Sequence, residues 1–328
     1  MNSKEIALQA MARGYPARVP ISYCNRDFQS SDTITFAYGK AADFVETEPG
    51  LTEWGYVWKK IDATMGQPVK EPLADWQQIS AYRPPDPWAP GRLDAVAAQA
   101  AQYLGKFFLI DMGITGSNVA MFLRGFENFI MDLTLERDRA EQVLDIVFGF
   151  ENGLIQRLAG GPVDGLRFCD DWGMQRGLII SPRVWREAFF PRYKAQFDLV
   201  HRAGMKVWFH TCGNVFEIIG DLIEAGADVL ELLQPDVMGV ERLADAFGGK
   251  VCFACSIDHQ RRAISGSHDE IFRYARLLQE QLGGANGAFI GFIEDYSCLG
   301  MDEEHFQWIR QAFHGLPLYA WATAAQAI

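Results

Sequence analysis

After residue 105 the chain alternates short apolar runs with longer segments whose apolar residues recur every three or four positions. The short runs are rich in β-branched and aromatic residues, which is typical of buried strands, whereas the longer segments are typical of amphipathic helices. The expected strands are 107–110, 165–168, 207–209, 229–233, 251–254 and 288–293. The expected helices are 137–158, 183–202, 215–224, 240–247 and 269–282, with a kink in the second at Pro191. Strands that alternate with helices in this way predict a parallel sheet.

The two ends of the chain complete this pattern. Residues 18–24 predict an earlier strand and residues 317–319 a last one, so that the count reaches about eight. About eight strand–helix units predict an α/β fold, the TIM (β/α)8 barrel, in one domain that covers residues 1–328. A doubly wound open sheet is the alternative, but no strand is followed by a G-x-G-x-x-G sequence or a phosphate-binding loop. The Ala-rich residues 320–328 are expected to form a tail.

Residues 31–105 follow no regular period and are expected to lie outside the barrel. Alternating aromatic residues predict a strand at 52–60 with a hairpin partner at 69–76, while the prolines of 83–91 exclude a helix there. So long an irregular segment is typical of a lid or a subunit contact. Its high aromatic content favours a homodimer, with a lid over the pocket as the alternative.

The composition of the chain excludes some classes of binding partner. The net charge of −12 and a pI of about 5.0 argue against binding of nucleic acid or of an anionic membrane, and favour a small-molecule substrate. No apolar run is long enough to span a membrane, and the N-terminus lacks a secretory signal, so we expect a cytoplasmic protein. Six cysteines are too few for a disulfide framework in 328 residues. Cys252 and Cys255 have C-x-x-C spacing, but within a strand their sulfurs would face opposite sides.

The stretch 206–214 carries the strongest candidate chemistry. A short apolar strand there ends in His210 and Cys212, which are two residues apart and can therefore point the same way. An imidazole and a thiolate on one turn are half of a plausible zinc site. Asn214 is expected to cap the next helix, with Glu217 at the third helical position.

Polar residues follow nearly every expected strand, at the ends where a TIM barrel carries its chemistry. They are Asn25 and Asp27, Asp111, Asp170 and Asp171, His210 and Cys212, Glu231 and Gln234, Ser256 with Asp258 to Gln260, and Glu294 to Tyr296. Any single one of them could be a helix cap. Their recurrence over so many strands predicts a polar pocket.

Several of these stretches, taken together, resemble the uroporphyrinogen decarboxylase superfamily. They are residues 170–177, 180–187, 190–194, 210–214, 233–235 and 256–260, and residues 53–55 and 71–75 extend the likeness upstream. The resemblance implies a TIM barrel and one of two activities, porphyrinogen decarboxylation or cobalamin-linked methyl transfer. The decarboxylases carry an N-terminal arginine-rich signature, whereas residues 20–26 here contain one arginine, Arg26. A substrate with many carboxylates needs several guanidinium partners, so the sequence is nearer the methyltransferase branch.

The resemblance also implies a metal site. The methyltransferases of the superfamily hold zinc with His-x-Cys and a distant cysteine, and His210 and Cys212 match the first two residues. Phe292 stands at the position expected for the third. Cys298, Glu294 and Glu231 are therefore the alternatives for the third ligand.

The remaining candidates are assigned to catalysis or to substrate binding. Asp170 and Asp171 are predicted as a pocket acid and base, with helix caps as the alternative reading. His259 is predicted as a proton donor, although on a loop it could equally be exposed to solvent. The predicted substrate-binding residues are Asn25, Asp111, Gln175, Arg176, Gln234, Asp258, Gln260 and Tyr296.

The function predicted from the sequence is that of a zinc-assisted methyltransferase. It would move a methyl group between a small O- or S-methyl substrate and cobalamin on a corrinoid partner protein. The alternative is a metal-free decarboxylase of a small carboxylic acid or tetrapyrrole, in which Asp170 or Asp171 stabilises a cationic intermediate and Arg176 holds a carboxylate. A third hypothesis is a corrinoid- or porphyrin-binding scaffold without turnover.

Overall fold

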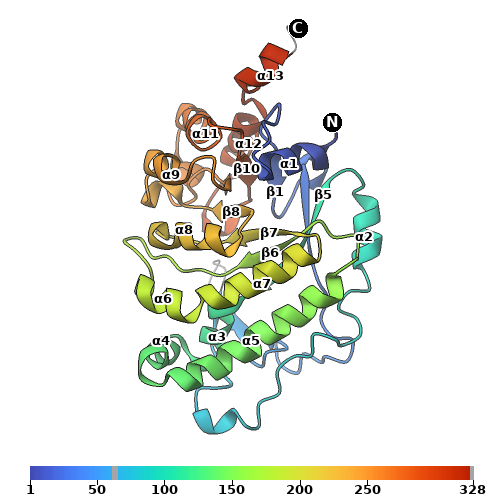
Figure 1. The fold of residues 1–328 in the computed structure, drawn as a ribbon, viewed down its shortest axis with the longest axis vertical. Helices are drawn as coiled ribbons and strands as arrows, with labels where there is room; N and C mark the ends of the chain where they lie inside the picture. The colour runs from blue at the N-terminus through green and yellow to red at the C-terminus, as the bar shows by residue number, and fades with distance from the viewer. Residues whose placement is uncertain (61–65, 326–328) are drawn as a thin grey trace.

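Eight parallel strands form a closed barrel in the computed structural model, which describes residues 1–60 and 66–325 (Figure 1). The barrel strands in chain order are β1 (Ile21–Tyr23), β2 (Thr33–Ala37), β5 (Phe107–Ile114), β6 (Gly165–Cys169), β7 (Lys206–His210), β8 (Val229–Leu232), β9 (Cys252–Cys255) and β10 (Phe289–Ile293). Neighbours in this order pair with each other, and β10 pairs with β1 to close the ring. The predicted TIM-barrel fold is confirmed.

One of the eight strands is not where the sequence pattern placed it. The predicted last strand at 317–319 is wrong, because this segment lies between two helices and joins no barrel strand. The missing strand is β2, which pairs with β5 over its full length and lies within the segment expected outside the barrel. The first residue of β2, Thr33, is polar, and its hydroxyl forms a hydrogen bond of 2.7 Å with the Ser22 hydroxyl inside the sheet. The pair is buried and satisfied, so an apolar run is not required there.

The helices lie around the barrel strands (Figure 1). They are α1 (Ser3–Met11), α2 (Val96–Gln102), α3 (Gly116–Arg124), α4 (Phe126–Leu135), α5 (Arg137–Leu158), α6 (Pro182–Ala188), α7 (Phe190–Arg202), α8 (Phe216–Ala225), α9 (Val240–Phe247), α10 (Arg262–Ser265), α11 (His268–Leu282), α12 (Glu303–His314) and α13 (Ala320–Ala325). The last of these, α13, projects beyond the body at the end where the N-terminus lies. No helix in the part of the chain that the structure describes is long and apolar enough to cross a membrane.

Two local predictions about helices need correction. The segment 183–202 forms two helices, α6 and α7, separated at Phe189, in place of one kinked helix. Pro191 lies in the first turn of α7, where its missing N–H group leaves no hydrogen bond unmade. The N-cap of α8 is Val215, not Asn214. The Asn214 side chain still accepts the Phe216 N–H at 3.4 Å, and its amide donates to the Val237 carbonyl oxygen at 3.4 Å.

The segment between β2 and β5 is less regular than predicted. Among its described residues, β3 (Trp58–Lys59) and β4 (Gln67–Pro68) form a short antiparallel pair. The strand expected at 52–60 is therefore wrong in extent, and the partner expected at 69–76 is wrong, because β4 ends before it. The segment packs on α5, where the Trp54 and Phe150 rings meet edge to face at 5.1 Å. The buried Arg92 binds Glu53 through two hydrogen bonds of 2.9 Å. The ring contact joins the segment to α5, and the ion pair links two parts of the segment to each other.

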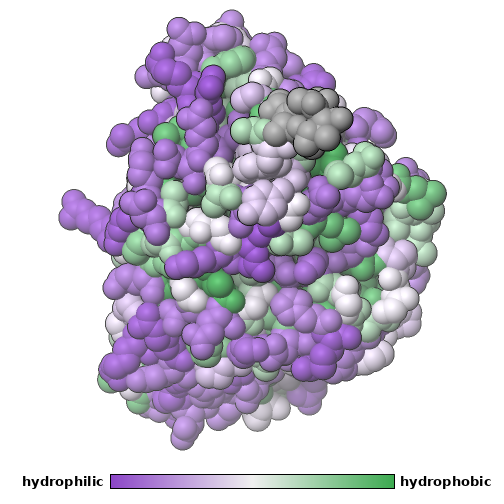
Figure 2. Space-filling view, turned by 45° about the horizontal axis from the view of Figure 1, so that its top comes forward, coloured by the Kyte–Doolittle hydropathy of each residue, from purple (hydrophilic) through white to green (hydrophobic). Residues whose placement is uncertain are grey.

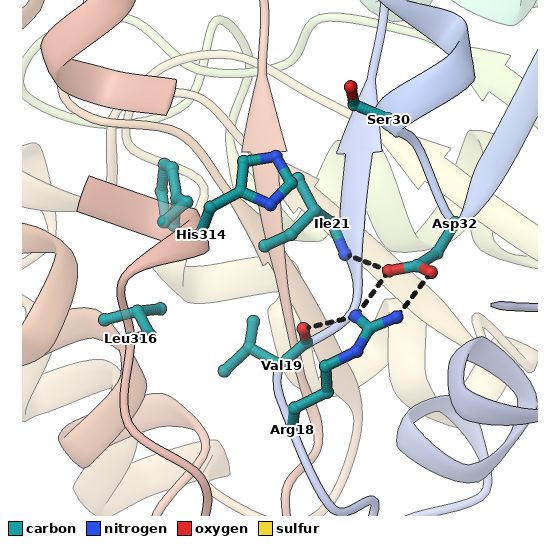
Figure 3. A pocket seen from close by; sticks show the side chains of 8 residues that line it. Arg18, Val19, Ile21, Ser30, Asp32, His314 and Leu316 are labelled. Carbon is teal, nitrogen blue, oxygen red and sulfur yellow. Dashed lines mark hydrogen bonds and ion pairs between the residues drawn. The ribbon is translucent and has the colours of Figure 1, made fainter. Parts of the chain in front are cut away.

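The N-terminal ends of the strands carry a structural ion pair. Arg18, just before β1, donates to both carboxylate oxygens of Asp32 at 2.7 and 2.8 Å (Figure 3). The same carboxylate accepts the Ile21 backbone N–H at 2.8 Å. It therefore joins the entries of β1 and β2. A pocket of about 260 Å³ lies beside this pair and is also lined by His314 (Figure 3).

Side chains of each strand alternate between the barrel interior and the surrounding helices. Cys252 belongs to the interior cluster with Trp208, whereas Cys255 packs in the cluster between sheet and helices. The two sulfurs of the C-x-x-C sequence thus face opposite sides, as predicted. The face shown in Figure 2 is mostly hydrophilic, with small and scattered apolar areas.

Candidate active site

Four side chains with metal-binding atoms meet at the C-terminal ends of β6 and β7. Atoms of Cys169, Asp171 and His210 all lie within 4.8 Å of one another. The Cys212 sulfur lies 3.5 Å from His210 Nε2, and the Cys212 backbone N–H donates to Asp171 at 2.8 Å. We call Cys169, Asp171, His210 and Cys212 the donor cluster. Two sulfurs, one imidazole and one carboxylate form a set that suits zinc.

His210 is oriented by a buried carboxylate behind it. Its Nδ1 donates to Glu231 Oε1 at 2.7 Å, which leaves Nε2 directed toward the donor cluster. Glu231 is fully buried and also accepts from Arg167 at 2.6 and 2.8 Å and from Trp208 Nε1 at 2.5 Å. A carboxylate that holds the far nitrogen of a histidine is the usual support of a metal-binding imidazole. Glu231, one of the candidate ligands, therefore has its oxygens occupied by this supporting role.

Arg167 places one buried positive charge at the centre of the barrel. Besides Glu231 it binds Asp111, with Nη1 at 3.2 Å from Oδ2. Burial raises the pKa of Glu294, and the neighbouring Glu231 charge adds to this effect. The mouth of the barrel thus holds one guanidinium among several acids, with the donor cluster beside it.

The electrostatics of the donor cluster favour an ionised carboxylate. Burial alone would raise the pKa of Asp171, but the hydrogen bond and charge of His210 hold it below its ordinary value. Burial raises the pKa of the Cys212 thiol, and His210 only partly opposes this. A bound metal ion would lower the pKa of the Cys212 thiol, because coordination to a metal deprotonates a thiol.

Asp170 and Asp171 are adjacent in sequence but differ in surroundings. Asp171 is 39% exposed in the barrel mouth, whereas Asp170 is fully buried. Asp170 accepts hydrogen bonds from the backbone of Ser117 and Asn118, from the Ser117 hydroxyl and from the Tyr193 hydroxyl. These donors lie at the first turn of α3 and on α7. The geometry of Asp170 is that of the helix-capping alternative.

Three of the predicted substrate-binding residues bind backbone groups. The Asn25 side chain exchanges hydrogen bonds of 3.1 and 3.0 Å with the Asp295 backbone. Gln234 accepts the Gly213 N–H at 3.0 Å, and Asp258 accepts two N–H groups of its own turn. These side chains shape the loops around the mouth of the barrel.

Asp111, another predicted binding residue, is paired with Arg167, and the remaining ones lie on the surface or beside His259. Gln175, Arg176 and Gln260 are exposed. The Tyr296 ring lies 5.1 Å from the His259 ring, and its hydroxyl donates to Ser256 at 3.4 Å. Burial lowers the pKa of His259, and its buried Nδ1 has no hydrogen-bond partner among the described residues. His259 is therefore a neutral imidazole with one nitrogen left to bind a ligand.

None of the three candidates for a third metal ligand, Glu231, Glu294 and Cys298, belongs to the donor cluster. Cys298 is exposed in the short turn Ser297–Leu299. Phe292 is buried in the barrel interior. Arg26, the single arginine of the N-terminal stretch, binds Asp295 and Glu303 at 2.9 and 3.0 Å.

Two residues of the site were missed by the sequence reasoning. Cys169 ends β6 and lies beside His210 in the sheet register. Cys169 and Asp171 are two residues apart, as are His210 and Cys212, so the same spacing indicates a second pair of side chains that point the same way. Arg167 was also missed, although a charged residue within an apolar strand calls for a buried partner, here Glu231.

The fold and the site together define a TIM barrel with a candidate metal-binding cluster at the C-terminal ends of its strands. A comparison with models of known protein families identifies the family of this chain. A model of the uroporphyrinogen decarboxylase (URO-D) family matches residues 60–290, which is more than half of the chain. The protein therefore belongs to the uroporphyrinogen decarboxylase family, and the expected superfamily is confirmed.

One solved structure agrees with the fold, and two others are less similar. A methyltransferase from Methanosarcina mazei has a TM-score of 0.66 and 16% identity, over 96% of this chain and 99% of that chain. The 3-keto-D-glucoside 4-epimerase YcjR from E. coli has a TM-score of 0.38 and 16% identity, over 66% and 78% of the two chains. A chitinase from Chromobacterium violaceum has a TM-score of 0.42 and 11% identity, over 90% and 99%. A search of curated proteins gave no match.

Proposed function

We propose that the protein is a zinc-dependent methyltransferase that moves a methyl group between a small O- or S-methyl substrate and a corrinoid carrier. The observation that carries the proposal is the donor cluster, with His210 held from behind by Glu231. Membership of the family and the likeness in fold to a methyltransferase support it. Porphyrinogen decarboxylation is less well supported, because Arg26 is already paired with two acids.

The donor set fits zinc. His210 Nε2 and the sulfurs of Cys169 and Cys212 would hold the ion, and three protein ligands leave a position for substrate. Zinc bound there would supply a Lewis acid that stabilises a thiolate or an alkoxide. Asp171 would then lie beside the open position, because it contacts both His210 and the Cys212 backbone.

The chain's own residues have distinct roles in this proposal. Glu231 keeps the proton of His210 on Nδ1 and so keeps Nε2 available as a ligand. Arg167 pairs with Glu231, and its charge and hydrogen bonds hold the pKa of this buried carboxyl well below its ordinary value, so that Glu231 stays ionised. Asp171 would orient the substrate, and His259 could exchange a proton with it through Nδ1.

Metal analysis of single variants tests the proposal. Protein purified without chelators is expected to contain one zinc per chain, and Cys169→Ser and Cys212→Ser should each lose most of it, because a hydroxyl does not replace a thiolate at neutral pH. Asp171→Asn should keep zinc and lose methyl transfer. The exposed Cys298→Ser is the matched control and should change neither quantity.

The activity is measured as formation or loss of methylcobalamin by visible absorbance. The competing hypothesis, a metal-free decarboxylase that uses Asp171, predicts the reverse order. Turnover would then depend on Asp171 and survive both Cys169→Ser and Cys212→Ser. Zinc content equal to that of the wild type in both cysteine variants would contradict the proposed ligands.

A further inference from the structure

A second cavity lies beside the barrel mouth and has no role in the proposed metal site. It has a volume of about 370 Å³ and lies between the irregular segment after β2, the end of β5 and α5. Its walls are largely aromatic and include Tyr38, Trp54, Tyr56, Trp58 and Phe150. We call this cavity the aromatic cleft. Its size is that of a small-molecule site.

The charged groups around the aromatic cleft are already paired. Glu53 binds the buried Arg92 through two hydrogen bonds and also accepts the Ala41 N–H at 3.0 Å. Lys40 lies 3.2 Å from Glu46 at the surface. A ligand of this cleft therefore meets aromatic faces and no uncompensated charge, which favours an uncharged planar ring.

One polar group in the cleft remains available. The Tyr38 hydroxyl has no hydrogen-bond partner among the described residues, and burial raises the pKa of Tyr38, so that the group stays protonated. It can donate to an oxygen substituent of a ring. The ligand chemistry is thus an uncharged aromatic ring that carries an oxygen.

The aromatic cleft adjoins the donor cluster at Ile114. Ile114, which lines the cleft and is 36% exposed, lies directly beside Cys169 in the register of β5 and β6. The pairing register of β5 and β6 shifts between Asp111 and Ile114, as in a β-bulge. The space beside Gly113 is open, because a Cβ atom placed on this residue would have no neighbour within 4 Å. Bulges of this kind redirect a strand end next to an active site. Neighbouring strands are about 4.8 Å apart, so a ring over Ile114 lies next to the donor cluster.

We propose that the aromatic cleft binds an oxygen-substituted aromatic ring and that this ring is part of the methyl-bearing substrate. The assignment of the ring to the substrate rests on the proposed methyltransferase function. The binding of the ring to the cleft does not, because it depends on the cleft residues alone. The two statements can therefore fail separately.

Calorimetric titration with a matched pair of probes tests the cleft. The probes are 4-methoxyphenol and 4-methoxycyclohexanol, which carry the same oxygen groups on an aromatic and a saturated ring. The full chain, with zinc and after chelator treatment, is expected to bind the aromatic probe about fivefold tighter than the saturated one. Equal affinity for both probes, or no binding of 4-methoxyphenol, would overturn the inference.

Variants locate the binding. Ile114→Asp places a charge on the floor of the cleft and should weaken 4-methoxyphenol binding about tenfold or more. Tyr38→Phe removes one hydrogen bond and should weaken it about threefold to tenfold. Leu104→Asp, at an 86% exposed position before β5, is the control and should bind as the wild type does. Unchanged affinity in both cleft variants would place the ring elsewhere.

Turnover then separates the two proposals. The assay supplies cob(I)alamin, which takes the methyl group from the ether oxygen of 4-methoxyphenol to give methylcob(III)alamin and hydroquinone. Methyl transfer that is lost in Ile114→Asp supports both proposals. Tight binding in the cleft without methyl transfer would leave the cleft assigned and contradict its use for the substrate. Methyl transfer from other ethers that persists in Ile114→Asp would support the metal site and contradict the role of the cleft.

Discussion

Two arginine–carboxylate pairs lie at opposite ends of the same barrel, and they differ in what surrounds them. Arg18 and Asp32 join the entries of β1 and β2, and the Arg18 side chain is 39% exposed. Arg167 and Glu231 lie inside the barrel near the strand exits, and their side chains are 10% and 0% exposed. The first pair binds only structural neighbours, whereas Glu231 also holds His210. The same chemical pair thus supports the fold at one end and prepares a site at the other.

The largest expected effect comes from breaking the buried pair. Glu231→Gln leaves the Arg167 guanidinium short of a partner inside the barrel, and we expect a loss of about 3 to 5 kcal/mol in the free energy of unfolding. Urea denaturation followed by circular dichroism measures it. The control is Glu187→Gln, which removes an exposed pair with Arg183 and should cost under about 0.5 kcal/mol.

The pair at the strand entries should matter less. Asp32→Asn keeps the shape and one acceptor oxygen but removes the charge, and we expect a loss of about 1 to 2 kcal/mol in the free energy of unfolding. Zinc content and methyl transfer should stay unchanged, because the pair lies at the opposite end from the donor cluster. A loss of zinc in this variant would contradict the division between the two ends.

Two buried carboxyl groups, Asp32 and Glu151, should respond to pH with opposite signs. Burial would raise the pKa of Asp32, but the hydrogen bonds and charge of Arg18 keep it below 3.8, so its contribution to stability is present at neutral pH and is lost in acid. Glu151 beside the first turn of α3 is different, because burial raises its pKa from 4.5 to about 8. Its contribution is complete below pH 4.5 and is lost as the pH rises toward 8.

The slope that results from Glu151 is, per pH unit, comparable to the loss expected in Asp32→Asn. Between pH 5 and pH 8 the wild type should lose up to about 1.4 kcal/mol of unfolding free energy per pH unit from Glu151. Burial also raises the pKa of Asp170, to about 7, so Glu151→Gln should reduce this slope without abolishing it. Urea midpoints at several pH values measure the slope. A slope equal to that of the wild type in Glu151→Gln would show that Glu151 is already ionised in the folded protein.

The pattern of apolar and polar residues along the chain determined much of the fold. The alternation of apolar runs and amphipathic segments sufficed for the barrel, because strand and helix periods are properties of consecutive residues. The spacing of His210 and Cys212 sufficed to bring their side chains together, since residues two apart on a strand share a face. Polar residues at strand ends indicated the end of the barrel that carries the site.

Only the tertiary structure decided which of these groups meet. Cys169 and Asp171 join His210 because β6 and β7 are adjacent and in register, which no local pattern specifies. Asp170 and Asp171 follow the end of β6, and the packing of α3 decides that Asp170 is the one enclosed. Strand β2 was hidden in the sequence because its polar start is satisfied by a neighbour fixed only in the closed barrel. Such pairings depend on contacts between distant segments, and those contacts exist only once the ring of strands has closed.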